Sequence, residues 1–108
     1  MVEKFFTPKE ANEILPEVKL IVAEILTLVR QIPVPQERIE ALMFRLEEMG
    51  CYYKDWNFEI GLVDFPAIIH GKPALLCWRS DEPVVAWFHG YEDGYAGRRP
   101  ITRELIFS

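Results

Sequence analysis

The chain has 108 residues, an apolar content of 50% and a formal net charge of −5. This length fits one domain, residues 1–108, and this apolar content supplies a hydrophobic core, which excludes an intrinsically disordered chain. The acidic balance, with no basic run longer than Arg98-Arg99, argues against duplex nucleic acid as a partner.

The cysteines and the N-terminus predict a cytoplasmic protein. Cys51 and Cys77 form neither a C-x-x-C pair nor a disulfide framework, so we expect buried thiols in a reducing compartment. The N-terminus has no apolar leader. Charged residues between Glu17 and Glu24 interrupt the longest apolar stretch, so no membrane contact is expected.

A first amphipathic helix is predicted to start at Pro8. Thr7 and Glu10 have the spacing of a capping box, and proline is favoured at the first helical position. Pro16 removes one backbone donor, so we expect a kink or a restart there. Apolar residues recur at helical spacing and form one core-facing stripe: Ala11, Ile14, Leu15, Val18, Ile21, Val22, Ile25, Leu28, Val29 and Ile32.

A second helix is predicted over residues 36–49, after a short connection that contains Pro33 and Pro35. Gly50 is placed to cap its C-terminus. A short connection makes neighbouring helices antiparallel, so about residues 8–49 form a helical hairpin. The apolar face of the second helix comprises Ile39, Leu42, Met43, Leu46 and Met49.

The second half, about residues 51–108, is predicted to form a small antiparallel sheet and a loop rich in glycine and arginine. The predicted strands are residues 62–69, 74–79 and 84–89. His70-Gly71 is a two-residue hairpin signal. It pairs residues across the first two strands as Ile69 with Lys72, Phe65 with Leu76, Asp64 with Cys77, and Val63 with Trp78. After Pro100 the residues at alternate positions, Ile101, Arg103, Leu105 and Phe107, predict a last, edge strand.

Alternation along the strands assigns two sheet faces. One face carries Val63, Phe65, Ala67, Ala74, Leu76, Trp78, Val85, Trp87 and His89. The other carries Leu62, Asp64, Pro66, Leu75, Cys77, Arg79, Val84, Ala86 and Phe88. Both faces are too apolar for solvent, so one packs on the helices and the other needs a partner chain or a ligand. Leu20 and Leu26 also lie outside the helical stripe, and together these features predict a homodimer.

The loop 90–100 is the first candidate site. Its glycines expose backbone N–H groups, and Arg98 and Arg99 offer bidentate donors for a carboxylate or phosphate. Tyr91 and Tyr95 could flank a planar ligand, with His89 beside them. The alternative is a structural loop in which Asp93-Gly94 forms a turn, the tyrosines pack, and Arg98 pairs with Glu92, Asp93 or a partner subunit.

The second candidate is a divalent metal site that would use His89, Glu92 and Asp93. In the alternative interpretation, one ring N–H of His89 donates a hydrogen bond to a loop carbonyl or carboxylate. Asp64 is expected to form an ion pair with Arg79, its diagonal neighbour. The face assignment places Asp64 opposite His89, although a register slip of one residue would bring them together.

No serine hydrolase elbow, P-loop, H-E-x-x-H or G-x-G-x-x-G motif is present. Three hypotheses follow. The first is a non-catalytic binding or assembly module that contacts an anionic small molecule or an acidic protein segment through the loop 90–100. The second is a metal-assisted or His-dependent hydrolase that uses His89 with Asp93, Glu92 or Asp64. The third is single-stranded RNA binding on an aromatic sheet face with Trp78 and Trp87 exposed.

Four ordered blocks resemble a family of small bacterial and archaeal proteins classed as a domain of unknown function. They are FTPxEANxILPE at 6–17, GLVDFPA at 61–67, LLCWR at 75–79 and WFHxxxDGYAGRRP at 87–100. The resemblance implies a helical hairpin followed by a small sheet. The predicted elements define an α+β fold in which this hairpin packs on an antiparallel sheet of three or four strands. The resemblance implies no activity, cofactor or catalytic residue.

Overall fold

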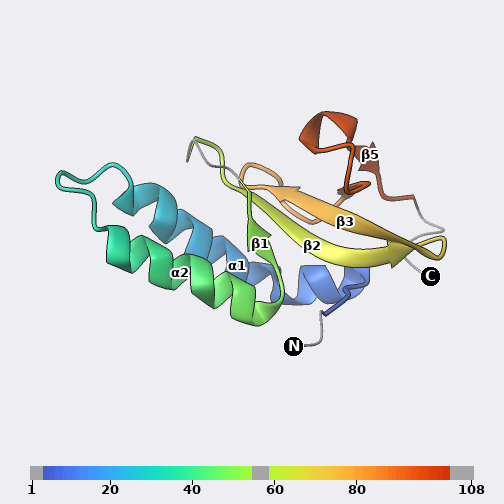
Figure 1. The fold of residues 1–108 in the computed structure, drawn as a ribbon, viewed down its shortest axis with the longest axis horizontal. Coiled ribbons are helices and arrows are strands. Elements are labelled where there is room, and N and C mark those ends of the chain that lie inside the picture. Colours follow the sequence, from blue (N-terminus) through green and yellow to red (C-terminus); the bar gives the residue numbers. More distant parts are fainter. Residues whose placement is uncertain (1–3, 55–58, 103–108) are drawn as a thin grey trace.

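The computed structural model describes residues 4–54 and 59–102. Within these residues, two helices precede a five-stranded antiparallel sheet, so the predicted α+β fold is confirmed with one strand more than expected (Figure 1). The predicted edge strand after Pro100 lies mostly outside the described residues. In chain order the elements are α1 (Pro8–Leu28), α2 (Gln36–Met49), β1 (Tyr52–Tyr53), β2 (Leu62–Ile69), β3 (Lys72–Arg79), β4 (Trp87–His89), a 3₁₀ helix (Tyr95–Gly97) and β5 (Arg99–Pro100).

Helix α1 begins with the predicted capping box. The backbone N–H of Glu10 donates to Thr7 Oγ1 over 3.1 Å, and the N–H of Thr7 donates to Glu10 Oε1 over 3.0 Å. The helix continues through Pro16 without a restart. It ends at Leu28, before the predicted end of the stripe at Ile32, because the N–H groups of Arg30 and Gln31 donate to carbonyls three residues earlier in place of four.

Helix α2 has the predicted bounds and returns antiparallel to α1. Gly50 ends it with a φ of 97°, a left-handed conformation that glycine adopts without steric cost. Two surface ion pairs join the helices, Arg38 to Glu24 at 2.8 Å and Arg45 to Glu17 at 2.7 Å. Neither described helix is both long and apolar enough to span a bilayer.

The β2–β3 hairpin confirms the predicted turn and register. His70 and Gly71 have φ values of 51° and 76°, as a primed two-residue turn requires. Asp64 therefore lies opposite Cys77. Strand β1, which was not predicted, adds to the other edge of β2 and places Tyr52 opposite Asp64.

The register of β4 corrects the predicted face assignment. His89 pairs with Leu75 and Trp87 pairs with Cys77, so both side chains lie on the Asp64 face and not on the Leu76 face. The strand starts three residues later than predicted. The reason is a contact from α1: the Asn12 side chain accepts from the N–H of Val85 at 2.7 Å and donates to its carbonyl at 3.1 Å.

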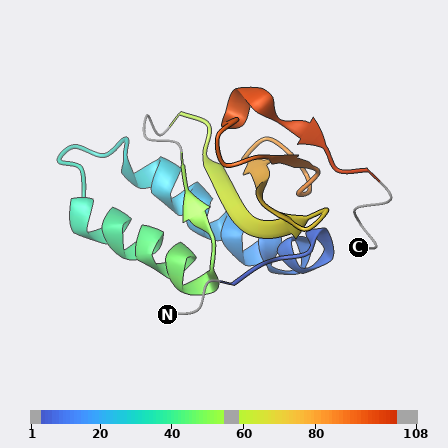
Figure 2. The same cartoon turned by 45° about the vertical axis from the view of Figure 1, so that its right-hand side comes forward.

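The helices cover one face of the sheet, and the segment after β4 lies over the other (Figures 1 and 2). The helix-facing side holds the buried core, in which residues of β2 and β3 pack with both helices: Val63, Phe65, Leu76, Trp78, Val18, Val22, Ile25 and Leu46. The second apolar face, predicted to need a partner chain or ligand, is thus covered in part by residues of the same chain.

Candidate functional site

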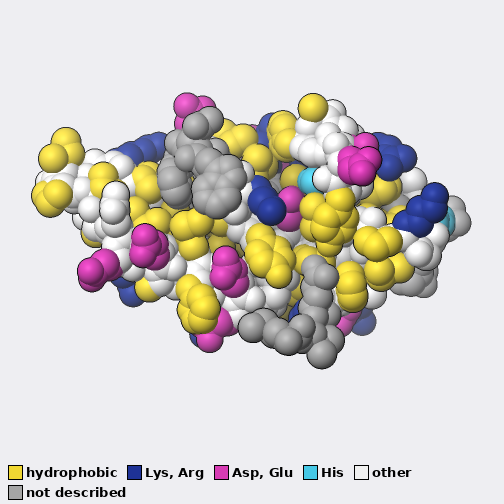
Figure 3. All heavy atoms as spheres, viewed as in Figure 1, with side chains coloured by type: hydrophobic (Ala, Val, Ile, Leu, Met, Phe, Trp, Pro, Cys, Tyr) yellow, Lys and Arg dark blue, Asp and Glu magenta, His cyan; other side chains and the backbone are white. Residues whose placement is uncertain are grey.

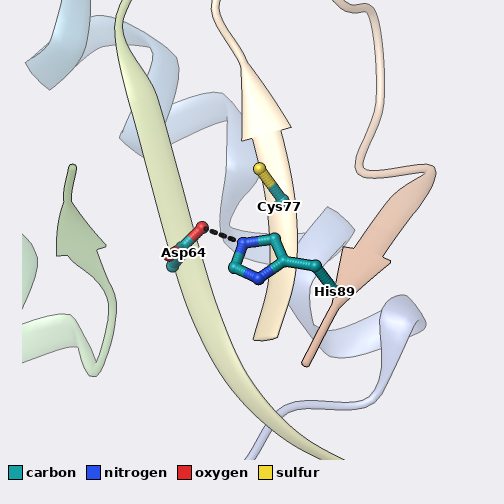
Figure 4. A group of neighbouring side chains, drawn as sticks. All are labelled: Asp64, Cys77 and His89. Atoms are coloured by element: carbon teal, nitrogen blue, oxygen red, sulfur yellow. Dashed lines mark ion pairs between the residues drawn. The ribbon is translucent and has the colours of Figure 1, made fainter. Parts of the chain in front are cut away.

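Three polar side chains meet on the sheet face that the helices leave uncovered. Asp64 comes from β2, Cys77 from its cross-strand partner position on β3, and His89 from the end of β4 (Figure 4). Their exposed fractions are only 5%, 1% and 4%. One ligand atom from each lies within 4.8 Å of the others. The fold therefore gathers a carboxylate oxygen, a thiol sulfur and an imidazole nitrogen in one buried cluster.

Hydrogen bonding fixes the role of each nitrogen of His89. Nδ1 lies 2.8 Å from the carbonyl oxygen of Gly90, which can only accept, so Nδ1 carries a proton. This matches the alternative in which His89 donates to a loop carbonyl. Nε2 faces Asp64 Oδ1 at 3.4 Å, the interaction drawn in Figure 4. Nε2 is consequently the nitrogen that points into the cluster.

Burial controls the protonation of the other two groups. It raises the pKa of Asp64, while the neighbouring His89 and Lys54 lower it in part. Burial, with the negative charge of Asp64, raises the pKa of Cys77 to about 12. In the absence of a cation the thiol is therefore protonated. A bound cation would favour the ionised forms of both groups.

A cleft of about 240 Å³ opens above the cluster and connects it to solvent. Figure 3 shows this side of the molecule, where basic, acidic and histidine side chains meet in a hollow between hydrophobic ones. We call it the central cleft. It is lined by Lys54, Leu62, Asp64, Leu75, Cys77, His89, Tyr91, Gly94 and Tyr95.

The tyrosines predicted to bind a ligand both line the central cleft, but the arginines do not. Arg98 is partly buried against Glu82, with 2.6 Å between Nη2 and Oε1. Its guanidinium also lies 5.0 Å from the ring centroids of Trp87 and Tyr95. Arg98 therefore links the loop to the turn before β4, as in the structural alternative, with Glu82 in place of the neighbours that were predicted.

Arg99 lies elsewhere, exposed and above the ring of Phe88 at 5.1 Å. It lines a second cleft of about 320 Å³ near the β2–β3 turn, together with His70 and Lys72. We call it the hairpin cleft. Its remaining lining is Ile69, Pro73, Ala74, Phe88 and Gly90. The two arginines predicted to act together are thus separated.

The acidic residues predicted to join His89 in a metal site are placed differently. Asp93 accepts from the N–H of Gly90 at 3.1 Å, which closes the turn after β4. Glu92 is exposed. Within the described residues, the group with metal-ligand geometry around His89 contains neither of them.

The predicted Asp64–Arg79 ion pair is wrong. Asp64 faces His89, because the register of β4 brings the imidazole to its side. Arg79, at the end of β3, instead pairs with Asp81 in the following turn and donates to the hydroxyl of Tyr95.

Cys77 is the site residue that sequence reasoning missed. Its pairing with Asp64 was predicted, but the cysteine was interpreted only as a buried thiol.

The hypothesis of RNA binding requires an exposed Trp78 on which a base could stack. The Trp78 side chain is only 1% exposed, and its indole N–H donates to the carbonyl of Glu82 at 2.8 Å.

These features define an α+β protein in which a helical hairpin covers one sheet face and an Asp–Cys–His cluster lies on the other. Residues 29–101 match the family described as an uncharacterized conserved protein, DUF2203, and the chain belongs to this family. The matched residues contain three of the four blocks that carried the resemblance. No curated protein and no solved structure matches the chain.

Proposed function

We propose that this protein binds a divalent transition metal through Asp64, Cys77 and His89. The observation that carries the proposal is the convergence of three different ligand atoms within 4.8 Å, from three neighbouring strands. Tetrahedral zinc bonds separate neighbouring ligand atoms by roughly 3.5 Å, so shifts of about 1 Å in the side chains suffice. The Nδ1–H bond of His89 to a backbone carbonyl is the orientation that metal-ligating histidines commonly have.

The donor types favour zinc, cobalt or ferrous iron. A thiolate is a soft ligand, whereas calcium and magnesium take oxygen ligands. Three protein ligands would leave a fourth position, and all three side chains line the central cleft, from which water or substrate could reach a bound ion. Structural zinc sites are closed by four protein ligands, whereas catalytic ones keep a position for water or substrate. The arrangement therefore supports the metal-assisted hydrolase hypothesis, with Asp64 and Cys77 in the roles first given to Glu92 and Asp93.

The test is a titration of the metal-free protein with Co²⁺, followed by optical absorption. A cysteine ligand gives a thiolate-to-cobalt charge-transfer band, and we expect one Co²⁺ per chain. Cys77→Ala should abolish the band. Cys51→Ala is the matched control, because Cys51 is equally buried and burial also raises its pKa to about 12. Absence of the band in the wild type, or its loss only in Cys51→Ala, would refute the proposal.

A second function, anion binding by the loop 90–100, is supported by one observation. Arg99 and Lys72 both line the hairpin cleft, which has an apolar floor. The contact of Arg99 with Asp93 is long, 3.9 Å, and leaves the guanidinium open to a ligand. We expect inorganic phosphate to shift the backbone amide signals around this cleft by NMR, and Arg99→Gln to remove the effect.

The cytoplasmic location predicted from the sequence remains part of the proposal. Both cysteines are free and buried, which fits a reducing compartment.

A further inference from the structure

We infer that the central cleft binds a small monocarboxylate with a flat apolar body, and that Lys54 binds its carboxylate. This inference rests on the proposed metal site and names the class of substrate that the site would take. It starts from Lys54, which no part of the metal cluster uses as a ligand.

A second hollow adjoins the central cleft, because three residues line both. This side hollow, of about 220 Å³, is lined by Tyr52, Lys54, Pro66, Leu75 and Tyr91. It shares Lys54, Leu75 and Tyr91 with the central cleft. A ligand at the open metal position could therefore extend past Lys54 into the side hollow.

The strands explain why Lys54 faces this space. Tyr52 pairs with Asp64, and alternation puts Lys54, two residues later, on the same face. The backbone N–H of Lys54 donates to the carbonyl of Leu62 at 2.7 Å, which continues the β1–β2 ladder and fixes the backbone. The ammonium lies 5.8 Å from the ring centroid of Tyr52.

Charge in the occupied site favours an anion. A divalent cation balances the negative charges of ionised Asp64 and the Cys77 thiolate, and His89 binds metals in its neutral form. Lys54 is the basic residue that both linings share, so its ammonium leaves one net positive charge. A singly charged carboxylate neutralises this charge, and ionised hydrogen-bond partners make the stronger hydrogen bonds.

The lining of the side hollow favours a flat apolar group beside that carboxylate. Pro66 and Leu75, a cross-strand pair, supply apolar surface, and Tyr52 and Tyr91 contribute aromatic rings to the same lining. Aromatic walls with a few placed polar groups are typical of sites for small organic ligands.

The experiment uses benzoate as the probe and Co²⁺-loaded protein as the reporter. Benzoate should change the visible cobalt spectrum of the wild type with a saturable dependence, and benzamide, which has no charge, should not. Lys54→Gln should weaken benzoate binding about tenfold or more, the usual effect of losing a hydrogen bond to a charged group. Lys54→Arg should restore part of it.

Lys9→Gln is the matched control, because Lys9 is also exposed but lies on α1, which covers the opposite face of the sheet. It should leave the cobalt response to benzoate unchanged. Equal affinities in the two Lys→Gln variants, equal responses to benzoate and benzamide, or no response of the wild type would overturn the inference while leaving the metal site intact. Loss of the thiolate-to-cobalt band itself would be a failure of the proposed function.

Discussion

Asp64 combines burial with a full set of polar neighbours, and its protonation should be visible in the stability of the metal-free protein. Burial raises its pKa above the ordinary value of 3.8. A raised folded-state pKa gives stability that is fully present below that ordinary value and is lost as the pH rises through the folded-state pKa. The wild type should therefore lose this contribution as the pH rises above about 4.

The asparagine in Asp64→Asn cannot ionise. The free energy of unfolding of this variant should therefore increase relative to that of the wild type as the pH rises through this range. Urea unfolding of the metal-free proteins at a series of pH values measures the difference. Asp81→Asn is a control of opposite sign, because the hydrogen bond from Arg79 lowers the pKa of Asp81. For Asp81 the contribution is lost as the pH falls. Parallel profiles for Asp64→Asn and the wild type would contradict the expectation.

Substitutions at the two neighbouring arginines, Arg98 and Arg99, should differ clearly in their effect on the free energy of unfolding. Arg98→Gln breaks a partly buried pair whose side chains are 10% and 14% exposed, so it should cost about 2 kcal/mol, the usual effect of losing a hydrogen bond to a charged group. Arg99→Gln removes an exposed side chain with a long contact and should stay within about 0.5 kcal/mol. Chemical denaturation measures both. Similar values for the two variants would contradict these placements.

At the scale of elements, the junction of β2 with α1 depends on Gly61. Its φ is 63°, and a Cβ at this position would lie 2.7 Å from Cγ1 of Val22 on α1. Gly61→Ala therefore combines backbone strain with overpacking, and we expect a loss of about 2–4 kcal/mol.

Gly71 is the matched control in the β2–β3 turn. Its φ of 76° is similarly left-handed, but a Cβ there meets nothing within 4 Å. Gly71→Ala should cost only the strain, about 1 kcal/mol. Thermal and urea unfolding of both variants test the difference, and equal losses would show that contact with α1 is unimportant.

The elements also show what local sequence can predict. The β2–β3 register followed from two turn residues, His70 and Gly71, because a short turn fixes the pairing of everything beside it. In the same way, the capping box of Thr7 and Glu10 predicted the start of α1, and Gly50 predicted the end of α2. Each of these signals lies within a few residues of the structure it determines.

The register of β4 could not be read in this way. Asn12 is 73 residues from Val85, and their hydrogen bonds exist only after α1 has packed against the sheet. The Asp64–Cys77 half of the cluster was therefore predictable, whereas the arrival of His89 beside it was not. Strand β1 is only two residues long, too short for an alternating pattern to identify it.

For the whole molecule, the predicted homodimer stays a proposal, and fewer exposed apolar residues now support it. Part of the second sheet face is covered within the chain, and Leu26 packs against the core. Leu20 remains, with 74% of its surface exposed on α1. We expect light scattering after size-exclusion chromatography to give a dimer for the wild type and a monomer for Leu20→Glu.

Ile32→Glu is the control for that measurement, because Ile32 is an apolar residue that is 97% exposed in the connection between the two helices. It should remain dimeric. A monomeric wild type would remove the proposal, and a dimer that survives Leu20→Glu would place the interface elsewhere.

The two hydrogen bonds between Asn12 and Val85 make the position of His89 depend on α1, a helix that contributes no ligand atom to the Asp64–Cys77–His89 cluster. A substitution on α1 that removes these hydrogen bonds would let β4 change its register, which would move the imidazole of His89 to the sheet face opposite Asp64. A genetic screen for lost metal binding would then recover positions on α1 alongside the ligands. Such a screen would map the assembly of the fold as well as its chemistry, and only the spectrum of the bound ion would tell the two apart.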